Sequence, residues 1–198
     1  EGSLQNLDEI ADRIRQDLSA KNAARDRALS ASRELVRFCA LSIRAVHRAQ
    51  FEQADELLTQ AEALVHELRQ SLATLPDVYY AGYVQDGLKE YAEARIVYAL
   101  VAGQSLPDPD TIHVDYAAYL NALGEAVGEL RRYILDALRQ GRSERCEEIL
   151  QHMDDIYSVL VTMDFPDAIT GNLRRTTDVT RSIMERTRGD LTFALRQN

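Results

Sequence analysis

Apolar and polar residues alternate along this chain with the period of helices, and the few breakers of helical structure are clustered. Glycine and proline gather around residues 75–77, 103–109, 140–143 and 165–167. Between these clusters the pattern predicts helices over residues 4–49, 51–74, 79–102, 110–139, 143–163 and 170–196. No segment has the alternation of a strand, and no linker or repeat divides the chain. The sequence therefore predicts one all-α domain over residues 4–198, a single-domain bundle of about six or seven helices.

The first of these helices is too long for a compact domain of this size. About 45 residues at a rise of 1.5 Å each would extend for about 70 Å. We therefore expect part of this helix to find its partners outside its own subunit.

The fourth predicted helix has two different faces. Leu120, Leu123, Val127, Leu130 and Ile134 recur at helical spacing and form its apolar face. Glu125, Glu129 and Asp136 fall on the other side, so this helix should present carboxylates away from its core-facing stripe.

Four glutamates form two pairs on two predicted helices. Glu90 and Glu93 are three residues apart, and Glu125 and Glu129 are four apart, so each pair lies on one helix face. The first pair interrupts an apolar stretch, where an ionised carboxylate needs a partner or a metal. Converging carboxylates would suit a divalent cation and phosphoryl chemistry. The alternative is chance, because an exposed pair costs only about 0.2–0.5 kcal/mol of repulsion.

A second cluster lies on the first predicted helix. Arg33, Arg37, Arg44, His47 and Arg48 fall within one arc of the helix. Leu35, Phe38, Cys39, Ser42 and Val46 take the opposing side. A row of guanidinium groups opposite a core-facing strip is typical of a surface that binds RNA or DNA phosphates. A solvated face with ordinary ion pairs is the alternative, and the pattern alone leaves both open.

Composition narrows the classes of function. With 45% hydrophobic and 28% charged residues, the chain reads as a soluble globular protein. Its net charge of −9 provides no global basic field, so a polyanion would need a local basic patch. His47, His66, His113 and His152 are scattered without a serine or cysteine partner, and no glycine-rich phosphate loop is present, which argues against nucleophilic catalysis.

The two cysteines and the first residues of the chain indicate the cellular compartment of the protein. Cys39 and Cys146 are far apart and read as buried free thiols, and neither spacing suggests zinc. No apolar run is long enough for a membrane span, and Glu1-Gly2-Ser3 looks more like a cloning scar than a signal peptide. We therefore expect a cytoplasmic protein with no membrane partner.

Several segments together resemble one known family. They are Ser-Arg-Glu at 32–34 leading to Ile-Arg-Ala-Val-His-Arg at 43–48, Tyr-Tyr at 79–80 leading to Gly-Leu-Lys-Glu-Tyr-Ala-Glu-Ala at 87–94, Tyr-Leu at 119–120 leading to Gly-Glu-Leu-Arg-Arg at 128–132, and residues 165–168, 173–175 and 187–191. In order and spacing they resemble the translin family, on the side of translin-associated factor X and its prokaryotic relatives. The resemblance covers nearly the whole chain.

The resemblance implies an all-α fold of about seven helices, an octamer closed into a hollow barrel, and RNA bound inside it. It also implies a magnesium-dependent endoribonuclease whose acidic residues map onto Glu90, Glu93, Glu125 and Glu129. The third position is typically aspartate in the nuclease branch, so the Glu125 carboxylate reaches one methylene further here. In such a barrel the arginines of the first helix would face inward, and the outer wall could carry the acidic net charge.

The sequence thus predicts an endoribonuclease acting on short or single-stranded RNA, with Glu90, Glu93, Glu125 and Glu129 holding Mg²⁺ or Mn²⁺. Two alternatives remain open. One is a scaffold of translin type that binds RNA or single-stranded DNA without cleaving it. The other is an all-α nucleotide pyrophosphohydrolase, although the second acidic pair is Glu-x-x-x-Glu where such an enzyme would have Glu-x-x-Asp.

Overall fold

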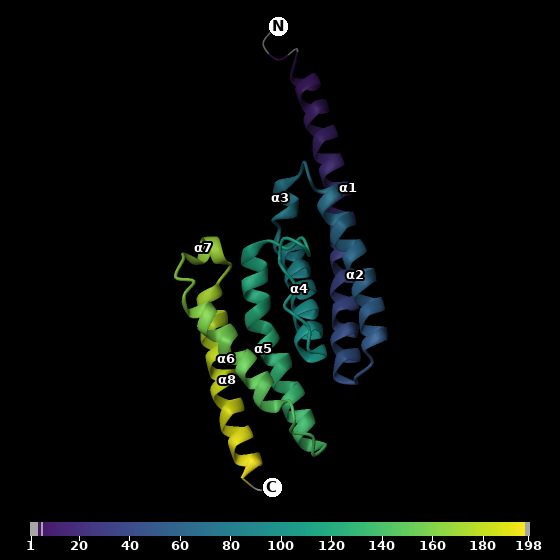
Figure 1. Ribbon diagram of the computed structural model, residues 1–198. Coiled ribbons are helices and arrows are strands. Elements are labelled where there is room, and N and C mark those ends of the chain that lie inside the picture. Colours follow the sequence, from purple (N-terminus) through teal and green to yellow (C-terminus); the bar gives the residue numbers. More distant parts are fainter. Residues whose placement is uncertain (1–3, 5, 197–198) are drawn as a thin grey trace.

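The structure is a computed structural model that describes residue 4 and residues 6–196, and within this part of the chain all regular structure is helical (Figure 1). The helices are α1 (Leu7–His47), α2 (Phe51–Ser71), α3 (Pro76–Tyr79), α4 (Gly82–Ala102), α5 (Tyr116–Arg139), α6 (Cys146–Val161), α7 (Asp167–Thr170) and α8 (Leu173–Leu195). The predicted all-α class is confirmed. The suggested cloning scar at residues 1–3 lies outside the described residues.

The main differences from the predicted helices lie at their ends. The first helix begins at Leu7 and ends at His47, because Ala49 takes a left-handed conformation with φ 58°. Residues 110–115, predicted as helix, form a turn instead, with His113 also left-handed. Tyr79 ends the short helix α3, which begins with Pro76, so α4 starts three residues later than predicted. A proline at the first turn and a left-handed residue after the last turn are the usual limits of a helix.

The helices form two groups that meet at the pair α4 and α5. Helix α1 packs along α2 and α4, while α5 packs against α6 and α8. Helix α4 is buried on almost every side, and Gly103 ends it in the left-handed conformation. Arg145 donates hydrogen bonds to the last carbonyls of α4, at Leu100 (3.1 Å) and Val101. The α4–α5 pair is therefore held from both sides.

Helix α5 approaches α8 closely at Gly124. A β-carbon at this position would overlap the side chain of Thr176 and touch that of Thr180. Thr180 donates a hydrogen bond to the Gly124 carbonyl (3.3 Å). The absence of a side chain at residue 124 thus sets the distance between the two helices.

The start of α1 extends beyond the bundle (Figure 1). Leu7, Ile14 and Leu18 are about half exposed there, and Ala24 is the first buried residue of the helix. These side chains are therefore available for contacts outside the subunit, and the expected partners there stay a prediction.

None of the described helices combines the length and apolarity needed to cross a lipid bilayer. Cys39 and Cys146 are both buried and unbridged, as the sequence suggested.

Candidate metal site and flanking grooves

Three of the four predicted acidic residues converge where α4 and α5 lie side by side. Carboxylate oxygens of Glu90 and Glu93 from α4 and of Glu125 from α5 all lie within 4.8 Å of one another. Their side chains meet because each helix turns its carboxylates toward the other at this level. We call Glu90, Glu93 and Glu125 the acidic cluster.

Glu93 is the most deeply placed member of the acidic cluster, with only 8% of the residue exposed. Burial raises its pKa to about 8, and the charges of Glu90 and Glu125 add to the effect. Burial likewise raises the pKa of Glu90, followed by the charge of Glu125. The fold therefore holds carboxylates together in a place where they need a proton or a cation.

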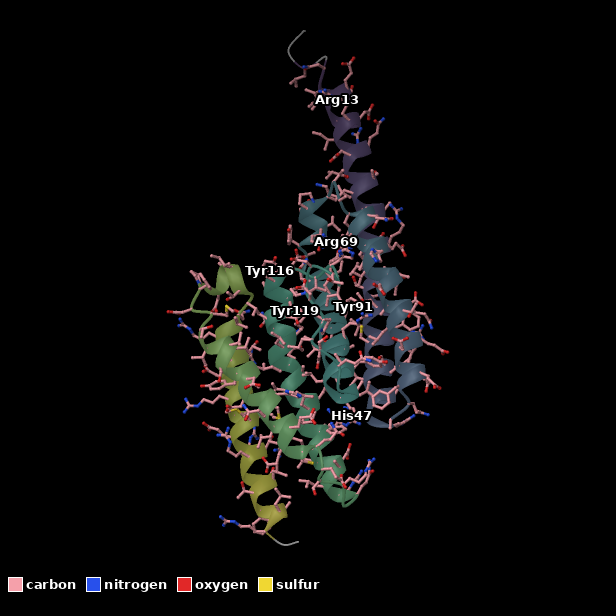
Figure 2. All side chains as sticks on the ribbon, viewed as in Figure 1. Arg13, His47, Arg69, Tyr91, Tyr116 and Tyr119 are labelled. Carbon is pink, nitrogen blue, oxygen red and sulfur yellow. The ribbon has the colours of Figure 1, made fainter. Side chains whose placement is uncertain are left out.

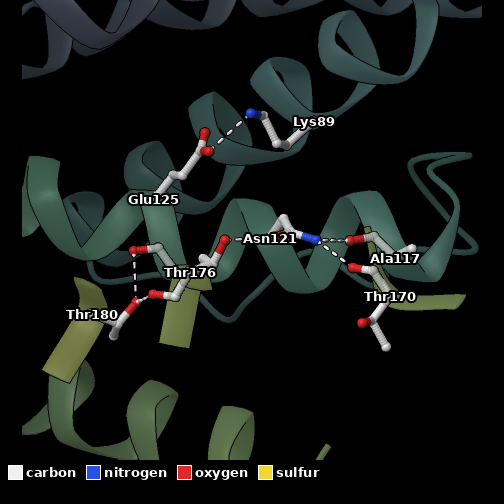
Figure 3. Close-up of polar contacts among 8 residues, drawn as sticks. Lys89, Ala117, Asn121, Glu125, Thr170, Thr176 and Thr180 are labelled. Atoms are coloured by element: carbon white, nitrogen blue, oxygen red, sulfur yellow. Dashed lines mark hydrogen bonds and ion pairs between the residues drawn. The ribbon is translucent and has the colours of Figure 1, made fainter. Parts of the chain in front are cut away.

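Lys89 provides part of that positive charge. Its ammonium group donates a hydrogen bond to a Glu125 oxygen at 2.8 Å (Figure 3). Burial alone would lower the pKa of Lys89, but the bond to Glu125 and the nearby acids raise it on balance. Among the described residues, Lys89 is the one cation bonded to the three carboxylates of the cluster, so an excess of negative charge remains.

Glu129, the fourth predicted acid, lies one turn further along α5 and has its own partner. Its Oε2 lies 2.6 Å from Nε2 of His47 and 3.9 Å from Arg132. The hydrogen bond from His47 is the main reason that the pKa of Glu129 is lowered. Glu129 is therefore ionised, and its charge contributes to the raised pKa of Glu93.

The side chain of His47 is buried, unlike those of the four arginines that share its arc of the first helix. It is only 4% exposed, and its Nδ1 atom has no hydrogen-bond partner among the described residues. Figure 2 shows His47 near the last turn of α1, where the helix faces α5. Arg33, Arg37, Arg44 and Arg48 are all exposed.

The arginines of α1 divide into two sets. Arg37 lies 3.3 Å from Glu34 and over the ring of Phe38, at 4.7 Å from the ring centroid. Arg44 and Arg48 instead line a groove of about 630 Å³. The other cations of this groove, which we call the Arg132 groove, are Arg132, Arg139 and Arg142. Sequence reasoning missed these three, although the seven-residue spacing of Arg132 and Arg139 places them on one face of α5.

A second groove, of about 810 Å³, lies on the other side of the acidic cluster, between α4, α5, α7 and α8. Its lining includes Tyr80, Lys89, Glu125, Ile169 and Arg175, and we call it the Tyr80 groove. Glu125 belongs both to this groove and to the acidic cluster, and Lys89 lines the groove beside it.

Asn121 holds the floor of the Tyr80 groove together (Figure 3). Its amide donates to the carbonyls of Ala117 (2.9 Å) and Thr170 (2.7 Å), and its oxygen accepts from Thr176 (2.6 Å). This joins α5, α7 and α8 at one buried side chain. No sequence pattern singled out Asn121, because its partners are far away along the chain.

The two grooves and the acids follow one face of α5 in order. Arg132, Glu129, Glu125 and Asn121 are separated by three or four residues, so they succeed one another turn by turn. The result is an all-α protein with a carboxylate site between a strongly basic groove and a mixed apolar and polar groove. These features define a class of helical proteins with an interhelical acidic site.

The chain belongs to the Translin family, whose family model matches residues 3–187. An uncharacterized protein of Methanocaldococcus jannaschii is 30% identical over 177 residues, covering 88% of this chain and 78% of that protein. Among solved structures, AfC3PO in complex with duplex RNA is 30% identical with a TM-score of 0.87, covering 95% of this chain and 97% of that one. NeC3PO without ligand shares the fold at 21% identity, with a TM-score of 0.83 over 98% of this chain and 100% of that one.

Proposed function

We propose that this protein is a metal-dependent endoribonuclease that hydrolyses RNA phosphodiester bonds at the acidic cluster. The convergence of Glu90, Glu93 and Glu125 within 4.8 Å is the observation on which this proposal rests. Buried structural acids normally have one cationic partner each, whereas here the negative charge exceeds the positive charge in contact with it.

The donor set fits a hard divalent cation such as Mg²⁺ or Mn²⁺. All three groups offer carboxylate oxygens, and the fold keeps them close despite the raised pKa of Glu93 and of Glu90. When bound, such an ion would polarise the phosphoryl oxygen and acidify water. Glu90, Glu93 and Glu125 would hold it, with Glu129 added directly or through water.

The remaining residues have separate roles in this proposal. Besides helping to hold the ion, Glu129 is oriented by His47, so it would accept a hydrogen bond from the attacking water and, as one of the four glutamates, would take its proton. Arg44, Arg48 and Arg132 would hold phosphates on one side of the cleaved bond. Lys89 would keep the charge of Glu125 balanced until substrate arrives.

RNA as the substrate is supported by the related structure of AfC3PO bound to duplex RNA. We extend this to short or single-stranded RNA, with single-stranded DNA as a further ligand. We also propose that the chain assembles into a closed homo-octameric barrel with the arginines of α1 inside, since apolar residues at the start of α1 lack a partner within the described chain.

A non-catalytic nucleic-acid scaffold is the second candidate. The observation that favours it is the Lys89–Glu125 ion pair at 2.8 Å, because an ammonium group engages one oxygen of the acidic cluster. The scaffold would bind RNA in the Arg132 groove without turnover.

The test is incubation of the pure protein with end-labelled RNA and Mg²⁺, with and without EDTA, beside a nucleoside triphosphate control for pyrophosphohydrolase activity. Glu93→Gln removes a charge and keeps the shape, so cleavage should fall at least about a hundredfold while RNA binding survives. Glu129→Gln should behave in the same way. RNA binding without cleavage would favour the scaffold. Cleavage that persists undiminished in EDTA, or an equally active Glu129→Gln protein, would contradict the metal-dependent mechanism at these glutamates.

A further inference from the structure

The Tyr80 groove has no role in the function proposed above, although it opens at the acidic cluster. Glu125 belongs to both, and Lys89 lines the groove and bonds to Glu125. A volume of about 810 Å³ is within the range of small-molecule sites in proteins. The chemistry of its walls indicates what it could bind.

Tyr80 provides an aromatic surface at this groove. The residue is 64% exposed, and its ring meets that of Tyr79 edge to face, with centroids 4.9 Å apart. Tyr79 is itself fixed, since its hydroxyl donates to Asp115 (2.6 Å) and accepts from Arg69 (3.1 Å). A supported, exposed aromatic ring is what proteins use to stack an unpaired base.

The groove also offers positive charge at separate points. Arg175 is exposed and has no ion pair or side-chain hydrogen bond with any residue that the structure describes. Lys89 lies at the end nearest the acidic cluster, beside Asp86 on the same lining. A ligand that suits this arrangement has a flat ring for Tyr80 and an anionic group for Arg175, which is the chemistry of a nucleotide.

The positions of the two grooves along α5 indicate that this nucleotide could be part of the RNA substrate itself. The Arg132 groove lies on one side of the acids and the Tyr80 groove on the other, both on one face of the helix. We propose that the Tyr80 groove binds one unpaired nucleotide of the RNA, next to the phosphate at the acidic cluster, with its base stacked on Tyr80. This inference rests on the proposed function.

The inference separates single-stranded from duplex RNA. A base within an RNA duplex is already stacked on both faces and paired at its edge, so it could enter the groove only by flipping out of the double helix. An interface between two copies is the competing occupant. It would bury Lys89 and Arg175, and charged residues are depleted from the centre of such interfaces.

The experiment uses full-length protein in EDTA, so that binding is measured without cleavage. A short single-stranded RNA carrying 5-iodouridine is photocrosslinked and the modified peptide is mapped, and affinities are measured for the same strand alone and in a duplex. Tyr80→Ala and Arg175→Ala are compared with Tyr116→Ala, the matched control, since Tyr116 (labelled in Figure 2) is also 64% exposed but is not among the residues that line the groove.

We expect the crosslink at Tyr80. Tyr80→Ala should weaken single-strand binding about tenfold without changing its salt dependence, because stacking is not ionic. It should leave duplex binding unchanged. Arg175→Ala should weaken single-strand binding and reduce the slope of log affinity against log salt by about one. Tyr116→Ala should bind as the parent does.

Each other outcome overturns the inference in a recognisable way. If the parent binds RNA but Tyr80→Ala binds equally well, this inference fails and the proposed function stands. If the parent binds no RNA, both fail. If Tyr80→Ala changes the assembled mass in light scattering without RNA, the groove is a contact between copies.

Discussion

Nε2 of His47 lies 2.6 Å from Oε2 of Glu129, although 82 residues separate them in the chain. This contact connects the last turn of α1 to the middle of α5. It also gives Glu129 a different partner from the acidic cluster: three carboxylates face one another, and the fourth is oriented by an imidazole. The two groups can be tested independently.

Changing His47 should reduce cleavage without changing assembly. His47→Ala removes the hydrogen bond that orients Glu129, and loss of such a supporting partner typically costs about 10- to 100-fold in activity or metal affinity. His47→Gln keeps a donor and should recover part of the activity. His152→Ala is the control, because His152 lies near Glu148 in a surface pair at 3.5 Å. Equal activity of His47→Ala and the parent would contradict a positioning role.

The stability of the metal-free protein should fall as the pH rises from about 5 to about 8. The pKa of Glu93 is about 8 in the folded protein against 4.5 for an ordinary glutamate, so the unfolded chain releases its proton first. Glu93→Gln should reduce this decline, with a smaller part left because the pKa of Glu90 is also raised, and it should melt at a higher temperature than the parent at pH 8, as followed by circular dichroism in EDTA.

Glu148 should contribute a pH dependence of stability with the opposite sign, so Glu148→Gln serves as the control for the Glu93 measurements. Arg145 lowers the pKa of Glu148 to about 2, so this glutamate contributes stability at neutral pH that is lost as the pH falls through that value.

Added Mg²⁺ should raise the melting temperature of the parent at pH 8 by more than it raises that of Glu93→Gln. A parent protein whose melting temperature is flat between pH 5 and 8 would rule out a buried, protonated Glu93.

The two sets of arginines on α1 should contribute unequally to RNA binding. Arg44→Ala with Arg48→Ala removes two cations from the Arg132 groove, so the slope of log affinity against log salt should fall by about two. Arg33→Ala with Arg37→Ala should have the smaller effect, because Arg37 is already engaged by Glu34 and Phe38. Fluorescence anisotropy at several salt concentrations gives both slopes. Unchanged affinity in both double variants would make the arginines an ordinary solvated face.

Assembly should depend on the projecting start of α1. Light scattering of the parent should give roughly eight times 22.3 kDa. Ile14→Asp with Leu18→Asp places charge on the exposed apolar stripe and should dissociate the oligomer. Gln16→Asp with Ala20→Asp adds the same charge on another face of the helix and should leave the mass unchanged. A stable monomer of the parent at micromolar concentration would remove the barrel proposal.

Helical periodicity was sufficient to predict much of the site. The spacings of Glu90 with Glu93 and of Glu125 with Glu129 fix the faces of α4 and α5, and the apolar surroundings of the first pair indicate burial. What periodicity cannot give is the pairing between distant elements. His47 lies at the edge of the arginine arc, adjoining the buried side of α1, so a small difference in helix rotation decides whether it faces solvent or Glu129.

The parts that the sequence did not predict depend on one local side-chain turn and on tertiary contacts. Residues 110–115 carry an acceptable helical pattern, but Asp108 accepts a hydrogen bond from the backbone N–H of Asp110 (2.9 Å) and favours a turn. The Arg132 groove draws its cations from the end of α1, from α5 and from the loop after α5. No local window of the sequence contains all of them.

Under the proposed function, the order of the grooves and acids along α5 also sets a minimum length for the RNA substrate. Arg132 and Asn121 are 11 residues apart in one unbroken helix, which is about 17 Å. At about 3.4 Å per nucleotide of a helical strand, this span corresponds to about five nucleotides, and to fewer where the strand is extended. Because a single helix sets this distance, neither loop movement nor subunit exchange can alter it, and RNA too short to span it could occupy only one groove at a time.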